Sequence, residues 1–299
     1  MARRSLTWPM GCVMALVFVA IPLPSAAARR LEITVLGASS DSPGMLDGQT
    51  YGLTTMFTLL DPSLSFGDSA SSGDGSALSS GSVGYGWARS LASASHSAAD
   101  EGVTRTSNAT TQSLFRDDLI ITSPGMSGGG TVTFLIEVSG GLAAMSLGDT
   151  PSTDASADWN AYARASTAPS EAGRIAEGSL IQSSFGVIAT GDLTGGEYEW
   201  GPIPFGFGSS FEVTIALNTS VDVDFCCSAA ANFESTLTWE GVVEIRDGNG
   251  ALADDFEITS GSGANFGEPI SVPEPASEAL ALMSLLTTAL LIRTRRSRQ

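Results

Sequence analysis

Short runs in which apolar and polar residues alternate dominate the chain, and this alternation is the period of a β-strand with one buried face. The runs are rich in Val, Ile, Thr, Phe and Trp, and Gly, Ser, Pro and Asp bound them. Many such strands with few helical segments predict an all-β fold, an antiparallel β-sandwich that is jelly-roll-like. The predicted strands are 31–36, 50–60, 119–122, 131–138, 181–190, 211–217, 221–227, 236–246 and 253–260. The segment 155–180 is interpreted as strand as well, although its alanine content permits a helix.

A hairpin is predicted between Glu240 and Ile258, where two apolar runs flank a turn sequence. Asp247-Gly248-Asn249-Gly250 fits the turn because Gly and Asn tolerate positive φ angles. A calcium loop is the alternative, but one Asp and one Asn fall well short of an EF-hand ligand set.

One segment, 61–102, departs from the strand pattern because Ser, Ala and Gly dominate it. Its low hydrophobicity predicts a flexible insertion in the sandwich, with Tyr85 and Trp87 as anchors to the sheet. His96, which is the only histidine, lies in this segment. We therefore expect His96 to be solvated, and neither a catalytic base nor a zinc ligand.

The first 28 residues have the pattern of a secretory signal peptide. Arg3 and Arg4 precede an apolar run, and small residues follow that run. Ala26 and Ala28 stand in the A-x-A relation that signal peptidase reads, so we expect cleavage before Arg29.

The chain ends with a motif, an apolar run and a basic cluster, in that order. Ala276 to Ile292 carries one charge, Glu278, and is just long enough to approach the thickness of a bilayer core. The basic cluster that follows is expected to stay in the cytoplasm by the positive-inside rule. Its members are Arg293, Arg295, Arg296 and Arg298.

The motif before this predicted transmembrane helix (276–292) is Val272-Pro273-Glu274-Pro275, and its two prolines favour an extended backbone that a protease can bind. Together, the motif, the apolar span and the arginines resemble the PEP-CTERM sorting signal of bacterial exosortase substrates. The resemblance covers 272–299. It implies recognition by an exosortase-like membrane protease of the transpeptidase type, cleavage near the motif, and transfer to the cell surface or extracellular matrix. It also implies an association with exopolysaccharide and biofilm.

The charge of the chain narrows the range of partners. The net charge is −18, there is no lysine, and six of the fourteen arginines lie in the two ends. The body, 29–271, is therefore more acidic than the whole chain, and such a charge repels nucleic acid and anionic lipid. Solubility of an exported protein explains the charge; carboxylates that gather calcium are the alternative.

Two cysteines, Cys226 and Cys227, remain once the signal peptide is removed, so the chain is not a disulfide-stapled scaffold. Strand alternation in VDVDFCCSA places Cys227 in the core and Cys226 at the surface. A strained vicinal disulfide and an intermolecular bridge through Cys226 are the alternatives.

The sequence predicts neither a cofactor nor a metal site, and it favours a non-enzymatic structural or adhesive role at the surface. A carbohydrate-active enzyme is one alternative, because two carboxylates suffice for glycoside hydrolysis. A sugar-binding module without catalysis is the other, with the stretch 195–208 as the candidate binding loop, although packing of this stretch over a sheet end is the favoured interpretation. The candidate residues for these alternatives are Glu197, Glu199, Glu240 and Glu244 for acid and base, and Trp200 and Trp239 for stacking on sugar rings.

Overall fold

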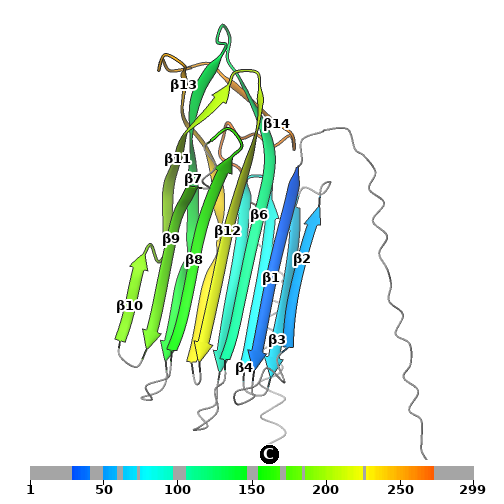
Figure 1. The fold of residues 1–299 in the computed structure, drawn as a ribbon, viewed down its shortest axis with the longest axis vertical. Helices are drawn as coiled ribbons and strands as arrows, with labels where there is room; N and C mark the ends of the chain where they lie inside the picture. Colours follow the sequence, from blue (N-terminus) through cyan, green and yellow to red (C-terminus); the bar gives the residue numbers. More distant parts are fainter. Residues whose placement is uncertain are drawn as a thin grey trace, which may run out of the picture.

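The protein folds as two antiparallel β-sheets packed face to face (Figure 1). The computed structural model describes residues 29–40, 50–58, 63–72, 75–96, 106–146, 154–168, 173–183, 186–224 and 227–272, and these ranges contain no helix. The predicted all-β sandwich is thereby confirmed. Strand alternation is the direct cause, since each long strand turns one face inward.

The first sheet has eight strands, in the order β10-β9-β8-β12-β6-β1-β2, with β14 also paired to β6. The strands are β1 (Arg30–Ser40), β2 (Thr50–Thr58), β6 (Thr106–Thr122), β8 (Asp154–Ala165), β9 (Gly173–Ser183), β10 (Gly186–Gly191), β12 (Ser210–Asp224) and β14 (Glu257–Ser260). β1 and β14 pair with the same edge of β6. Residues 106–116 of β6 pair with β1, and residues 119–122 of β6 pair with β14. The strand β14 therefore continues the line of β1 along that edge.

The second sheet has six strands, in the order β11-β7-β13-β5-β4-β3. The strands are β3 (Ser63–Ser72), β4 (Gly75–Gly84), β5 (Trp87–His96), β7 (Gly129–Ser146), β11 (Gly195–Gly206) and β13 (Cys227–Asp247). Its central strands β5 and β13 lie against β6 and β12 of the first sheet.

One part of the core between the sheets is aromatic. Phe134 lies against Trp239 with ring centroids 4.3 Å apart, and Trp159 lies against Phe233 at 4.7 Å. All four side chains are almost fully buried. Such rings dominate the burial of apolar surface because each covers a large area.

The other part of the core is made of small side chains. It is formed by Ala77, Ala92, Ala94, Ala109, Ala155, Ala157, Val221, Val223, Cys227, Ala229 and Ala231. Nearby, the hydroxyl of Ser113 donates to the backbone carbonyl of Arg89 in the facing sheet at 2.6 Å, and Thr111 Oγ1 donates to the carbonyl of Leu91 at 2.7 Å. Side chains this short reach the opposite backbone only where the sheets approach more closely than the usual spacing of about 10 Å.

This close packing overturns the flexible insertion predicted for 61–102. The segment forms β3, β4 and β5, which are half of the second sheet. On β5 the small residues Ala88, Ser90 and Ala92 are fully buried, and the positions between them are half-buried. The prediction was wrong because low hydrophobicity was taken as disorder, whereas small side chains fill a narrow interior. His96 is also buried, with 3% of its surface exposed, and not solvated as predicted.

Several strand boundaries also differ from the prediction. The run 181–190 is divided between β9 and β10, while 211–217 and most of 221–227 belong to the single strand β12. The turn at Asp247–Gly250 is confirmed, since Gly250 N donates to Asp247 O at 2.9 Å. The second arm of that hairpin, however, leaves β13 after Ala253 and joins the first sheet as β14.

Candidate functional site

The predicted processing motif begins at Val272, the last residue that the structure describes. The other residues assigned to processing lie outside the described ranges: Ala26, Ala28, Pro273, Glu274, Pro275, Arg293, Arg295, Arg296 and Arg298. The same is true of the predicted signal peptide (1–28), the predicted transmembrane helix (276–292) and Cys226. The site is therefore described through the chain that leads to it, residues 261–272, which we call the shoulder segment.

The shoulder segment crosses from the first sheet to the second. It starts after β14, where Gly261 N donates to the carbonyl of Asp118 on β6 at 2.8 Å. It ends beside β13, where Ile270 N donates to the carbonyl of Trp239 at 2.9 Å. The N–H of Trp239 in turn donates to Gly86 O, in the turn between β4 and β5, at 2.8 Å. The segment thus closes one open side of the sandwich.

A buried carboxylate fixes the start of this crossing. Asp117 lies on the core side of β6 with no exposed surface. One of its oxygens accepts hydrogen bonds from Ser262 N at 3.0 Å and from Asp118 N at 2.8 Å, and the other accepts one from the Ser262 hydroxyl. Burial raises the pKa of Asp117, while the hydrogen bonds from Ser262 and Asp118 act in the opposite direction.

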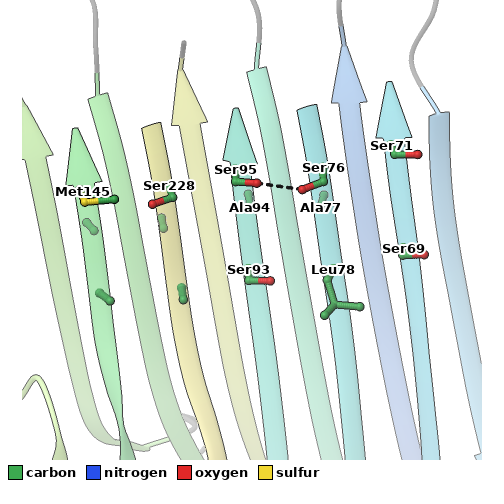
Figure 2. Close-up of a pocket in the computed structure, with 14 residues that line it drawn as sticks. Ser69, Ser71, Ser76, Ala77, Leu78, Ser93, Ala94, Ser95, Met145 and Ser228 are labelled. Carbon is green, nitrogen blue, oxygen red and sulfur yellow. Dashed lines mark hydrogen bonds between the residues drawn. The ribbon is translucent and has the colours of Figure 1, made fainter. Parts of the chain in front are cut away.

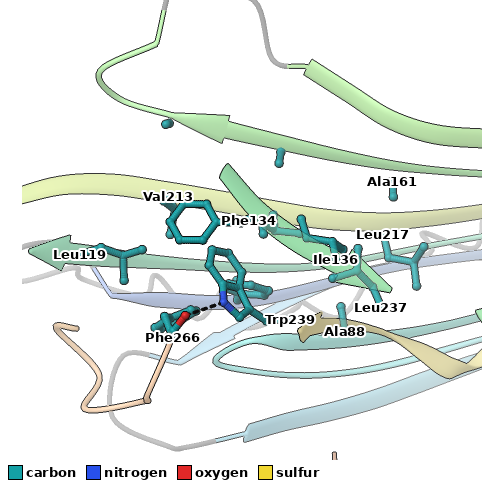
Figure 3. Close-up of a cluster of buried hydrophobic side chains, with 14 of the residues drawn as sticks. Ala88, Leu119, Phe134, Ile136, Ala161, Val213, Leu217, Leu237, Trp239 and Phe266 are labelled. Atoms are coloured by element: carbon teal, nitrogen blue, oxygen red, sulfur yellow. Dashed lines mark hydrogen bonds between the residues drawn. The ribbon is translucent and has the colours of Figure 1, made fainter. Parts of the chain in front are cut away.

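A buried ring fixes the middle of the crossing. Phe266 has no exposed surface, and its ring lies edge-on to Trp239 with centroids 4.8 Å apart (Figure 3). Its carbonyl accepts a hydrogen bond from the Trp239 indole N–H at 2.8 Å. The ring of Phe266 therefore fills space in the aromatic core, and its carbonyl satisfies the indole N–H of Trp239.

The end of the crossing is fixed at Ile270, whose side chain packs against Gly86. Gly86 has a φ of +88°, and a Cβ at this position would collide with Ile270. Only Ser271 and Val272 follow Ile270 in the described chain. The contacts that hold the folded body together therefore extend to within two residues of the predicted motif.

A second aspartate fixes the connection on the opposite side of the sandwich, where the chain passes from β10 to β11. Asp192 Oδ1 accepts hydrogen bonds from Thr194 N at 3.2 Å and Gly195 N at 3.1 Å, and Oδ2 accepts one from the Tyr198 hydroxyl at 2.8 Å. The Asp192 carbonyl also accepts one from the Trp159 indole N–H at 2.7 Å. These bonds to the carboxylate, that of Tyr198 above all, lower the pKa of Asp192.

Cys227 occupies the core position that the alternation predicts. It is 1% exposed and lies in the small-residue part of the core with Val221 and Val223. The side chain of Asp222 points to the other face of β12.

Two of the candidate glutamates come together with a third on the outward side of the second sheet. Glu197 on β11 pairs directly with Glu137 on β7, and Glu137 pairs with Thr238 on β13. Burial, followed by the charges of Glu137 and Glu197, raises the pKa of Glu240. A carboxyl group shifted in this direction can serve as a general acid. Sequence reasoning did not single out Glu137.

Three of the remaining candidates, Glu244, Trp239 and Trp200, contact other side chains of the body, whereas Glu199 is exposed on β11. Glu244 forms an ion pair with Arg246 at 2.7 Å, and the Arg246 hydrogen bond lowers its pKa. Trp239 is completely buried, so its proposed stacking on sugar rings is wrong. Trp200 is half-buried and packs on Phe134, with centroids 5.8 Å apart. The stretch 195–208, which the sugar-binding alternative treats as a loop, is mostly the strand β11.

Two shallow hollows lie elsewhere on the body. One, of about 740 Å³, lies over β3, β4, β5, β13 and β7 and is lined by serine and alanine with Leu78 and Met145 (Figure 2). The other, also about 740 Å³, is lined by 254–260 and by parts of the shoulder segment, with Asp254, Asp255 and Glu268 among its residues. Neither hollow is lined by Glu137, Glu197 or Glu240.

The comparisons with known proteins add no family. No protein-family model matches the chain, and no curated protein matches it in sequence. Within the described ranges, no helix is long and apolar enough to cross a membrane. The same ranges hold no group of three or more His, Cys, Asp or Glu side chains that could bind a metal ion.

Asp117 and Asp192 are two further residues that sequence reasoning missed. A signal for Asp117 exists, because it shares the core parity of Phe115 and Leu119 within LFRDDLIIT. A signal for Asp192 also exists, because Asp followed by Thr and Gly is typical of turns in which a carboxylate accepts backbone N–H groups.

Proposed function

We propose that this is an exported surface protein whose C-terminal Val272-Pro273-Glu274-Pro275 motif is cleaved by an exosortase-like transpeptidase. The observation that carries the proposal is the position of Val272. Val272 is the last residue of the shoulder segment, and the described backbone hydrogen bonds between this segment and the body end at Ile270. A protease that binds an extended backbone needs such a position, outside the hydrogen-bonded sheets and next to a folded body.

The remaining features of the proposal follow from the two chain ends. Signal peptidase would cut after Ala28, and the helix 276–292 with its cytoplasmic arginines would hold the protein in the membrane until cleavage. The body would then be a jelly-roll-like sandwich at the cell surface or in the extracellular matrix. Its role there would be structural or adhesive, in association with exopolysaccharide. The acidic net charge of −18 supports a body that remains soluble outside the cell.

A matched pair of substitutions in the native host tests this proposal. Glu274→Gln changes the motif, whereas Glu257→Gln removes a carboxylate from the exposed side of β14. We expect Glu274→Gln to accumulate as full-length chain in the membrane fraction, and Glu257→Gln to be processed like the unchanged protein. Equal processing of both variants would contradict the proposal.

A carbohydrate-active enzyme is the second candidate, and the gathering of Glu137, Glu197 and Glu240 favours it. Glycosidases use two carboxyl groups about 5–10 Å apart, one of them with a raised pKa. If Glu240 is that acid, Glu240→Gln abolishes release of reducing ends from the host exopolysaccharide, and Glu244→Gln does not. A sugar-binding module would bind the polysaccharide in both variants without releasing any ends.

A further inference from the structure

Within the described ranges, the strand β10 is an edge of the first sheet and pairs with no second strand. It stands at one end of the strand order, pairs with β9 and projects beside the body (Figure 1). Every one of its residues is exposed. An edge strand presents a row of backbone N–H and C=O groups, and these can pair with another extended chain. The chemistry that β10 can recognise is therefore a β-strand.

The side chains of β10 are apolar on both faces. Val187 is 60% exposed and Ile188, on the other face, is 59% exposed. Ile188 lies directly opposite Ile181 of β9, which is 37% exposed on the same face. The strand GVIATG contains neither a charge nor a proline. Exposed strands with this composition pair readily with other strands.

The other edges of the two sheets are protected. β11 carries Glu197, Pro202 and Pro204, and charges and prolines block strand addition. β3 carries Asp68, whose carboxylate accepts a hydrogen bond from the Ser69 N–H at 2.8 Å. β2 packs against β3 of the other sheet. Among these edges, β10 is the one with described, exposed apolar side chains and with no charge or proline that would block strand addition.

We propose that β10 pairs in antiparallel fashion with β10 of a second copy of this chain, about a twofold axis at Ile188. A twofold contact is self-complementary, and it is the commonest symmetry of soluble oligomers. The net charge of −18 makes most contacts between two copies repulsive, but β10 brings no charge to the contact. The first sheet would then continue through both copies.

The proposed register specifies which residues of the two copies lie opposite each other. Opposite residues in an antiparallel pair point to the same face, so Ile188 faces Ile188 of the second copy and Val187 faces its Ala189. Ile181 of each copy extends this apolar row on the outer face. The contact is smaller than a standard protein interface, so the dimer is expected to be weak and dependent on concentration.

A cysteine cross-link in the full chain tests the register. Cβ atoms of directly opposite residues lie about 4.5–5.5 Å apart, so Ile188→Cys should form a disulfide-linked dimer under mild oxidation. Thr190→Cys is the matched control, because its counterpart lies about 13 Å away along the strand. The unchanged chain is oxidised in parallel, and any dimer that it forms shows how much cross-linking occurs through its native cysteines. A product of twice the chain mass, seen with Ile188→Cys alone, is the expected result.

Sedimentation of the full chain in mild detergent tests the dimer itself. The mass of the unchanged protein should rise with concentration, and Ile188→Lys should remain a monomer with an unchanged midpoint of thermal unfolding. No cross-link, an equal cross-link through Thr190→Cys, or a cross-link to a different protein would overturn the proposal. Identical sedimentation of Ile188→Lys and the unchanged chain would overturn it as well.

Discussion

Asp117 and Ser262 are 145 positions apart in the chain, yet two hydrogen bonds join them inside the folded body. Asp117 lies on a central strand of the first sheet, and Ser262 lies in the segment that leads to the predicted processing motif. The contact therefore couples the order of the shoulder segment to the stability of the whole sandwich.

Removal of the Asp117 carboxylate should destabilise the protein. Asp117→Ala leaves the N–H groups of Ser262 and Asp118 buried without an acceptor, at a cost of about 1–3 kcal/mol in the free energy of unfolding. Asp117→Asn keeps an acceptor oxygen and should cost less. Denaturant unfolding measures both, with the exposed Asp254→Ala as the control. If Asp117→Asn and Asp117→Ala lose equal stability, the hydrogen bonds to this residue are not the cause.

The same residue predicts a pH dependence. Burial raises the pKa of Asp117 above its ordinary value of 3.8, so the folded state binds this proton more tightly than the unfolded state. Its favourable contribution is complete below pH 3.8 and is lost as the pH rises through the raised pKa. The stability of Asp117→Asn relative to the unchanged protein should therefore be higher at neutral pH than at about pH 4. Urea unfolding at both pH values measures the difference, and a constant difference would contradict the assignment.

Asp192 should behave in the opposite way. Its pKa is lowered, so its contribution is present above its ordinary value of 3.8 and is lost as the pH falls through the folded value. Asp192→Ala should lose about 0.5–1.5 kcal/mol at neutral pH, because its hydrogen-bond donors lose their acceptor but water can replace it at this partly exposed site. Tyr198→Phe should cost less by itself and nothing further in the Asp192→Ala background. Additive losses in the double variant would exclude a direct coupling.

The close approach of the two sheets predicts the effect of an added methyl group. A Cβ at Gly81 on β4 would lie 2.6 Å from Ser113 Oγ and 3.0 Å from Ile33 Cγ2. Gly81→Ala should therefore destabilise the protein by about 1–3 kcal/mol through overpacking. Gly141→Ala on β7 is the control, since a Cβ there meets no atom within 4 Å. Thermal unfolding compares the two variants, and equal midpoints would contradict the close packing.

The strands with large apolar residues could be predicted from the sequence, and those with small residues could not. In 131–138 and 236–246, branched and aromatic residues alternate with polar ones, and both runs lie inside strands. In β5 the inward positions are occupied by Ala88, Ser90 and Ala92. Hydrophobicity does not distinguish these residues from a loop, because what selects them is the narrow space between the sheets.

The processing motif is a prediction from the sequence alone, because its elements are contiguous in the chain and the described residues include only Val272 of the motif. The contacts that lead to it could not be predicted, since Asp117, Trp239 and Phe266 meet only after both sheets have formed. The register of β11 with β7, which places Glu137 beside Glu197, likewise depends on tertiary pairing that no spacing in the sequence encodes.

The most direct test of the proposed function is the intact mass, with the C-terminal peptide, of the protein recovered from its native host. The account predicts a chain that begins at Arg29 and ends near Pro275, and any added mass at that end would identify the group to which it is joined. A chain that still ends at Gln299 would contradict processing at the motif. The C-terminal helix would then be a permanent anchor.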